Sequence, residues 1–159
     1  MDLNLNKPTL LALSRFYDER GFLEPLYESK INSEICIKRS LSKEGVIRGL
    51  HWQKLPNPQR KLVYVLKGAI MDVCLKVEKD NILKSNKHEF IIREEDKKCL
   101  FIPSNFAHAY QAISEEAIIL YICLDRYSAD SEISFNPLAY DINWLERDLI
   151  ISKKDLEGN

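Results

Sequence analysis

Alternating apolar positions dominate the middle of the chain and predict a series of β-strands. Residues 62–66 read Leu-Val-Tyr-Val-Leu, so both alternating sets are apolar and the strand should be buried on both faces. A turn at Lys67-Gly68 leads into residues 69–77, a second run rich in β-branched residues. The same pattern predicts further strands over 88–93, 98–102, 108–113 and 117–124.

Closely spaced strands without helical periods between them favour a sandwich or a barrel. Short helices are expected only within the first thirty residues and in the tail after Trp144. The chain shows no internal repeat, no low-complexity tract and no linker, and 159 residues suit one core. Residues 1–159 are therefore expected to form a single domain.

Composition narrows the classes of partner. The chain has 23 basic and 24 acidic residues, which gives no electrostatic footprint for nucleic acid or an anionic membrane, although a local basic pocket for one phosphate group stays open. No run of 18 apolar residues is present, and the polar N-terminus does not resemble a signal peptide. We therefore expect a cytoplasmic protein.

The cysteines are scattered rather than paired in CxxC motifs. Two of them lie inside apolar strand runs, where a thiol acts as a small apolar side chain. Buried thiols are thus favoured over a disulfide or zinc framework. The four are Cys36, Cys74, Cys99 and Cys123.

Each of the three histidines can be weighed singly. His88 lies in a charged stretch typical of the surface. His51 fits either a core histidine bonded to a backbone carbonyl or a functional group, and His108, which follows a proline turn, is equally open. Arg48, three residues before His51, should face the opposite side of a strand unless Gly49 introduces a bulge.

Three basic residues are placed to meet a charged substrate, although each could equally be a solvated surface cation. They are Arg20, Arg48 and Lys61. Lys61 comes directly before an apolar strand, which could put its ammonium group at the mouth of a barrel.

Six motifs in order along nearly the whole chain resemble those of the dTDP-4-dehydrorhamnose 3,5-epimerase family. They are Asp-Glu-Arg-Gly-Phe (18–22), Arg-Gly-Leu-His-Trp-Gln (48–53), Pro-Gln-Arg-Lys-Leu-Val (58–63), Phe-Ile-Pro-Ser-Asn-Phe-Ala-His-Ala-Tyr (101–110), the Tyr121–Glu132 spacing, and the closing series 136–137, 142–144 and 151–155. The fourth of these motifs matches the family pattern IPxGFAHGF. The resemblance implies an all-β, cupin-type jelly-roll barrel with short helical segments near the N- and C-termini. It also implies a homodimer, a nucleotide-diphosphate 4-keto sugar as substrate, and no cofactor.

The resemblance further implies the roles of individual residues. His51 would remove a proton from the carbon beside the keto group, and Asp155 would hold the tautomer of His51. Lys61 would stabilise the enolate, and Tyr121 would return a proton from the opposite face. From the pattern alone, Tyr121 is a core aromatic residue and Asp155 a solvated tail residue.

A second set of residues would bind the substrate, if the family pattern holds. The sugar and the pyrophosphate would meet one group, and the nucleotide end would meet another. The first group is Arg20, Arg48 and His108, the second is Tyr127, Glu132 and Lys154, and Gln59 is a further expected substrate-binding residue.

Departures from the family pattern leave the nucleotide open. Cys36 and Lys38 stand where the family carries a Gln-x-Asn pair, and Pro25 stands where it carries an acid. No metal is expected, because cupin metal sites use several imidazoles, commonly as His-x-His, and this chain has Gln53 two residues after His51.

Two alternatives are enzymes on the same barrel, and a third is a protein without catalytic activity. A sugar-nucleotide 3,4-ketoisomerase would share the barrel, but the histidine-rich stretch typical of ketoisomerases is replaced here by His51-Trp52-Gln53. An epimerase acting on one carbon only is left open. A non-catalytic cupin that binds a sugar nucleotide is disfavoured, since binding alone requires neither a base nor an opposed acid.

Overall fold

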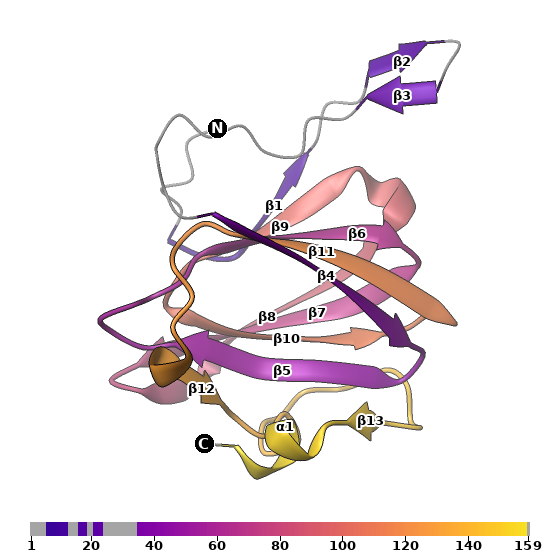
Figure 1. The fold of residues 1–159 in the computed structure, drawn as a ribbon. Coiled ribbons are helices and arrows are strands. Elements are labelled where there is room, and N and C mark those ends of the chain that lie inside the picture. The colour runs from indigo at the N-terminus through magenta and orange to yellow at the C-terminus, as the bar shows by residue number, and fades with distance from the viewer. Residues whose placement is uncertain (1–5, 13–15, 19–20, 24–34, 159) are drawn as a thin grey trace.

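The structure is a computed structural model that describes residues 6–12, 16–18, 21–23 and 35–158, and most of its regular structure is β-strand. Two curved sheets lie face to face (Figure 1). The first has the order β1 (Thr9–Ala12), β9 (Lys98–Ile102), β6 (Lys61–Lys67), β11 (Glu116–Cys123) and β4 (Cys36–Lys43). The second has the order β12 (Glu132–Ser134), β5 (Val46–Gln53), β10 (Phe106–Ala112), β7 (Ala69–Glu78) and β8 (Asn81–Arg93). The prediction of an all-β barrel of the cupin type is confirmed.

The remaining elements are short. β13 (Ile150–Ile151) pairs in parallel with β5, and β2 (Phe16–Asp18) pairs with β3 (Gly21–Leu23). Two single 3-10 turns cover Glu94–Asp96 and Ala129–Ser131, and the one α-helix among the described residues is α1 (Lys153–Glu157). The expected C-terminal helix is therefore present. The expected N-terminal one is wrong for the described residues, which form β1, β2 and β3 there.

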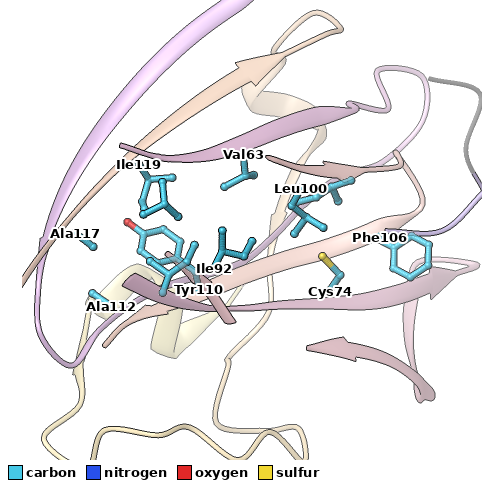
Figure 2. Packing of buried hydrophobic residues seen from close by; sticks show 12 residues of the cluster. Val63, Cys74, Ile92, Leu100, Phe106, Tyr110, Ala112, Ala117 and Ile119 are labelled. Atoms are coloured by element: carbon cyan, nitrogen blue, oxygen red, sulfur yellow. The ribbon is translucent and has the colours of Figure 1, made fainter. Parts of the chain in front are cut away.

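The main core fills the space between the two sheets. Val63 and Ile119 from the first sheet point toward Tyr110 and Ile92 from the second (Figure 2). Leu62 and Tyr64, on the other face of β6, belong to a separate buried cluster. Residues 62–65 of β6 are thus buried on both faces as their pattern predicts, whereas Leu66 at the end of the run is 46% exposed.

Helix α1 is only five residues long, so its ends need support from outside the helix. The Ser152 hydroxyl accepts a hydrogen bond from the Asp155 N–H, which satisfies an otherwise free donor of the first turn. Gly158 ends the helix at a φ of 66°, a conformation that glycine adopts without strain. This local capping fixes the position of Asp155 against the barrel.

Candidate active site

A cavity of about 260 Å³ opens between the two sheets near the crossing of β4, β5, β6, β10 and β11. The lining residues come from both walls and from the loop after β11. They are Lys38, Arg39, Ser40, Arg48, His51, Trp52, Gln53, Gln59, Lys61, His108, Tyr110, Tyr121, Cys123, Tyr127 and Glu132.

A bulge in β5 lets two residues of unlike parity share the cavity. Against β10, His51 is opposite His108 and Arg48 is opposite Tyr110, so three steps on one strand match two on the other. Gly49 lies inside this step at a φ of 120°, and a Cβ there would collide with the backbone of His108. Glycine is required because a side chain would fit neither the conformation nor the space. Without a bulge, Arg48 and His51 would face opposite sides of β5. The bulge at Gly49 is present, and both side chains line the same cavity.

His51 and Asp155 form a close pair although 104 residues separate them. Nε2 of His51 lies 2.7 Å from Oδ1 of Asp155, while the Gly49 N–H donates to Oδ2 at 3.3 Å. Asp155 is 5% exposed. Burial alone would raise the pKa of this carboxyl, but the hydrogen bonds from His51, Gly49 and Ser152 hold it below its ordinary value. A buried anion therefore contacts one ring nitrogen of His51, and Nδ1 is left to accept a proton.

A second pair joins His108 to Asp72, a residue that the sequence reasoning missed. Nε2 of His108 lies 2.7 Å from Oδ2 of Asp72, and Asp72 is fully buried on β7. The signal was present, because Asp72 is the one acidic residue inside the apolar run 69–77. A buried carboxylate needs a partner, and that partner is one strand away. The pair holds the His108 ring at the cavity wall.

Lys61 lies at the start of β6, opposite Cys123 of β11, and lines the cavity. Burial lowers the pKa of its ammonium group, and the nearby charge of Glu132 partly offsets that effect. A partly desolvated cation interacts strongly with any negative charge that develops beside it, because little water screens it.

Tyr121 lies on β11, in the wall across from β5, and its phenol lies within a group of polar side chains. Burial raises the pKa of Tyr121 well above its usual range, and ionisation of the adjacent Tyr110 phenol would raise the pKa of Tyr121 further by charge repulsion, while a hydrogen bond donated by Ser40 at 3.5 Å acts in the opposite direction. The Tyr121 ring also packs edge-on against His108, with centroids 6.5 Å apart. At neutral pH Tyr121 is therefore a protonated donor.

The cavity mouth carries a connected polar group. The Tyr127 hydroxyl donates to Glu132 at 3.2 Å, and Lys154 donates to the same oxygen at 2.8 Å. Burial would raise the pKa of Glu132, but Lys154 and the neighbouring donors lower it. The Lys38 ammonium lies 4.3 Å from the centroid of the Tyr127 ring, a cation–π contact.

The remaining members of the expected binding set are placed differently from one another. Arg48 donates from Nε to the Ser42 hydroxyl and from Nη2 to the Leu41 carbonyl. The Gln59 amide lines the cavity but donates to the Asp125 carbonyl, so it also braces the wall. Arg20, like Pro25, lies outside the described residues.

Positive charge prevails at the cavity. Of the described residues that line it, Lys38, Arg39, Arg48 and Lys61 are basic and Glu132 is the one carboxylate. Such a lining favours an anionic ligand. Among all the residues that the structure describes, no group of three or more histidine, cysteine, aspartate or glutamate side chains is arranged to hold a metal ion. No helix among them is long and apolar enough to cross a membrane.

The fold and the cavity together define a class of enzyme. An imidazole backed by a carboxylate faces a phenol across a cationic cavity, a combination suited to moving protons on and off a carbon acid. Such an arrangement is typical of an isomerase that moves protons at carbon.

Comparisons with known proteins agree with this class. The family model for dTDP-4-dehydrorhamnose 3,5-epimerase matches residues 2–159. The chain is 34% identical over 152 residues to the dTDP-4-dehydrorhamnose 3,5-epimerase of Methanothermobacter thermautotrophicus. The aligned region covers 88% of this chain and 82% of that protein. The chain belongs to the dTDP-4-dehydrorhamnose 3,5-epimerase family and is a nucleotide-sugar epimerase.

Solved structures extend the likeness to the fold. The 3,5-epimerase of Legionella pneumophila in complex with dTDP-4-keto-L-rhamnose superposes with a TM-score of 0.83 at 29% identity, over 97% of this chain and 87% of that one. The dTDP-4-dehydrorhamnose 3,5-epimerase of Sulfolobus tokodaii gives 0.82 at 33% identity, over 94% and 88%. These comparisons lend no support to a ketoisomerase or to a binding protein without activity.

Proposed function

We propose that the chain inverts carbon 3, carbon 5 or both in a nucleotide-linked 4-keto-6-deoxy sugar, or a closely related sugar. The observation that carries the proposal is the position of His51 on β5 and Tyr121 on β11, in opposite walls of one cavity. A 4-keto group acidifies the C–H bonds on both neighbouring carbons, because the carbanion delocalises onto oxygen. Inversion then needs a base on one face and an acid on the other.

His51 is the base in this proposal. Imidazole has an intrinsic basicity near neutral pH, which suits proton removal from an activated carbon. The carboxylate of Asp155, 2.7 Å away, keeps the imidazole in the tautomer that presents a free Nδ1 and stabilises the imidazolium that forms. The His51 side chain is 32% exposed, so the substrate can reach it.

Lys61 and Tyr121 serve the enolate. When the C–H bond breaks, its electrons move toward the keto oxygen, and the Lys61 ammonium stabilises the developing negative charge. The Tyr121 phenol then gives its proton to the carbon from the opposite face, which completes the inversion and leaves a phenolate. Because burial raises the pKa of this phenol, it stays protonated, and thus able to donate, across the neutral range.

The substrate's charge and its nucleotide end fit the rest of the lining. Arg48 and His108 lie beside His51 on the same wall and are assigned to the sugar and the pyrophosphate, together with Gln59 and with Arg20. Tyr127, Glu132 and Lys154 are assigned to the nucleotide. The identity of the nucleotide, both its nucleobase and its pentose, is not assigned, because Cys36 and Lys38 occupy the strand positions from which other members of the family contact the nucleotide. None of the four cysteines, all of which lie in the described part of the chain, is joined in a disulfide; this fits a reducing compartment, and we place the enzyme in the cytoplasm.

We further propose a homodimer in which the segment around Arg20 reaches the partner's cavity. β4 is the last strand of its sheet and exposes 64% of Ile37 and 51% of Leu41, and an edge strand of this kind can be covered by a second chain. If Arg20 serves the partner, mixing Arg20→Ala with His51→Ala chains creates one intact site per mixed dimer and restores activity. Activity no higher than the sum of the parents would refute the exchange.

A panel of 4-keto sugar nucleotides that vary in base and sugar tests the function. Each is incubated with the protein in heavy water, and the mass gain and the configuration of the product are followed over time. Label and inversion in at least one member support the proposal and identify the nucleotide. A panel without any label would contradict the proposal and favour a protein that only binds.

A further inference from the structure

Five polar side chains form a continuous hydrogen-bonded chain behind Tyr121. Nε of Arg48 lies 3.0 Å from the Ser42 hydroxyl, which lies 2.8 Å from the Tyr110 hydroxyl. The Tyr110 hydroxyl lies 3.0 Å from the Ser40 hydroxyl, which donates to the Tyr121 oxygen at 3.5 Å. Ser40 and Ser42 share one face of β4, and the other members come from β5 and β10 of the second sheet and from β11 of the first.

The direction of every bond in this chain follows from proton counting. Ser40 has one proton and donates it to Tyr121, so at the next contact Tyr110 must be the donor. Tyr110 has then spent its proton, and Ser42 must donate to it. Ser42 accepts in turn from Arg48, whose guanidinium can only donate. All four bonds therefore point from a cation toward the oxygen of Tyr121.

We propose that Tyr110 is a positioning residue whose hydroxyl, through Ser40 and Ser42, links the Arg48 cation to the Tyr121 phenol. The inference rests on the proposed function, in which the Tyr121 O–H bond breaks, a C–H bond forms, and a phenolate is left behind. Hydrogen bonds that point the same way polarise one another, so the chain stabilises this phenolate more than Ser40 does alone. The 3.5 Å contact shortens when the acceptor becomes an anion.

Tyr110 is buried and only 1% exposed, so its hydroxyl needs partners, and both serines supply them. Its side chain is held by the core cluster, where Val63 and Ile119 lie opposite it (Figure 2). Phenylalanine at position 110 would keep that packing and lose only the oxygen. Tyr110→Phe is therefore a minimal break in the chain.

The test measures exchange and inversion separately on one substrate in heavy water. Tyr110→Phe should lower the rate of inversion relative to exchange by about fivefold, the effect of one typical hydrogen bond, while KM and the exchange rate stay within about twofold. Ser42→Ala breaks the next link and should do the same, and the double variant should lose no more than either single one. Tyr64→Phe, a buried tyrosine of β6 outside the cavity, is the matched control and should change neither rate.

An unchanged ratio of inversion to exchange in Tyr110→Phe, with wild-type inversion intact, would overturn this inference alone. Equal loss of both rates would also overturn it, because it would show a general structural role. A multiplicative loss in the double variant would show that the two hydroxyls act independently, which contradicts a single chain. A wild type that exchanges no label would instead refute the proposed function.

Discussion

Replacing Asp155 by asparagine keeps the size of the side chain and removes the buried charge beside His51. In the proposed reaction the imidazole becomes an imidazolium, and the Asp155 carboxylate, 2.7 Å from Nε2, stabilises that cation. An asparagine amide has no charge to offer. If its NH₂ group faces Nε2, it also selects the tautomer that carries the proton on Nδ1, where the base must be free.

The expected loss can be estimated from the kind of contact that is removed. A hydrogen bond to a charged group contributes about 1.5–3 kcal/mol, and full loss of that amount in the transition state lowers the rate roughly 10- to 150-fold. The effect should fall on proton removal, and so on exchange and inversion equally. KM should change little, because Asp155 does not line the cavity.

The assay is the initial rate of deuterium uptake from heavy water at saturating substrate. Glu157→Gln is the matched control, because it removes one carboxylate from the same short helix at a position where the side chain is 64% exposed. It should keep the wild-type rate. Thermal unfolding of both variants shows whether α1 still docks. A folded Asp155→Asn variant that exchanges within about threefold of the wild type would refute the role given to this pair.

Three further outcomes are expected. Tyr121→Phe should impair inversion more than exchange, since the acid acts after the base, and equal impairment in a kinetic assay of both would contradict the order. Activity should survive exhaustive chelation, because His51 lacks the imidazole partners of a cupin metal site, whereas recovery of a dialysed, inactive enzyme by added iron or manganese would disprove this. Asp125→Asn should destabilise the fold by about 1 kcal/mol at neutral pH. Burial raises the pKa of Asp125, but the paired Arg60 outweighs that effect and holds the pKa below its ordinary value, so the stabilisation is present above the ordinary pKa of an aspartate and is lost as the pH falls through the lowered pKa. Urea unfolding that shows the same difference at pH 3 and pH 7 would contradict it.

The strands of this fold could be predicted from sequence because their two-residue period is local. The runs 69–77 and 98–102 correspond closely to β7 and β9, and residues 62–65 of β6 are buried on both faces as an all-apolar pattern implies. The expectation of an N-terminal helix was wrong for the described residues, since β1 gains its hydrogen bonds from β9, far away along the chain. Pairing of that kind leaves no trace in a short window of sequence.

The site was harder to predict, because its members come from strands whose register the sequence does not state. His51 meets Asp155 only through the bulge at Gly49 and the capped turn at Ser152. The resemblance to a family suggested this pair, and periodicity alone would have left Asp155 in solvent. Asp72 and the Ser40–Tyr110 contact were missed because a buried polar side chain gives no sign of its partner until the strands are aligned.

The most direct test of the account is the product formed in heavy water during a single turnover. The proposed chemistry removes hydrogen from one face through His51 and returns a proton from the other through Tyr121, which has equilibrated with solvent. Each inverted carbon should therefore carry one deuterium, and His51→Ala should give neither label nor inversion. Inverted product that retains its original hydrogen would contradict the account, because no base and opposed acid could then have carried out the reaction.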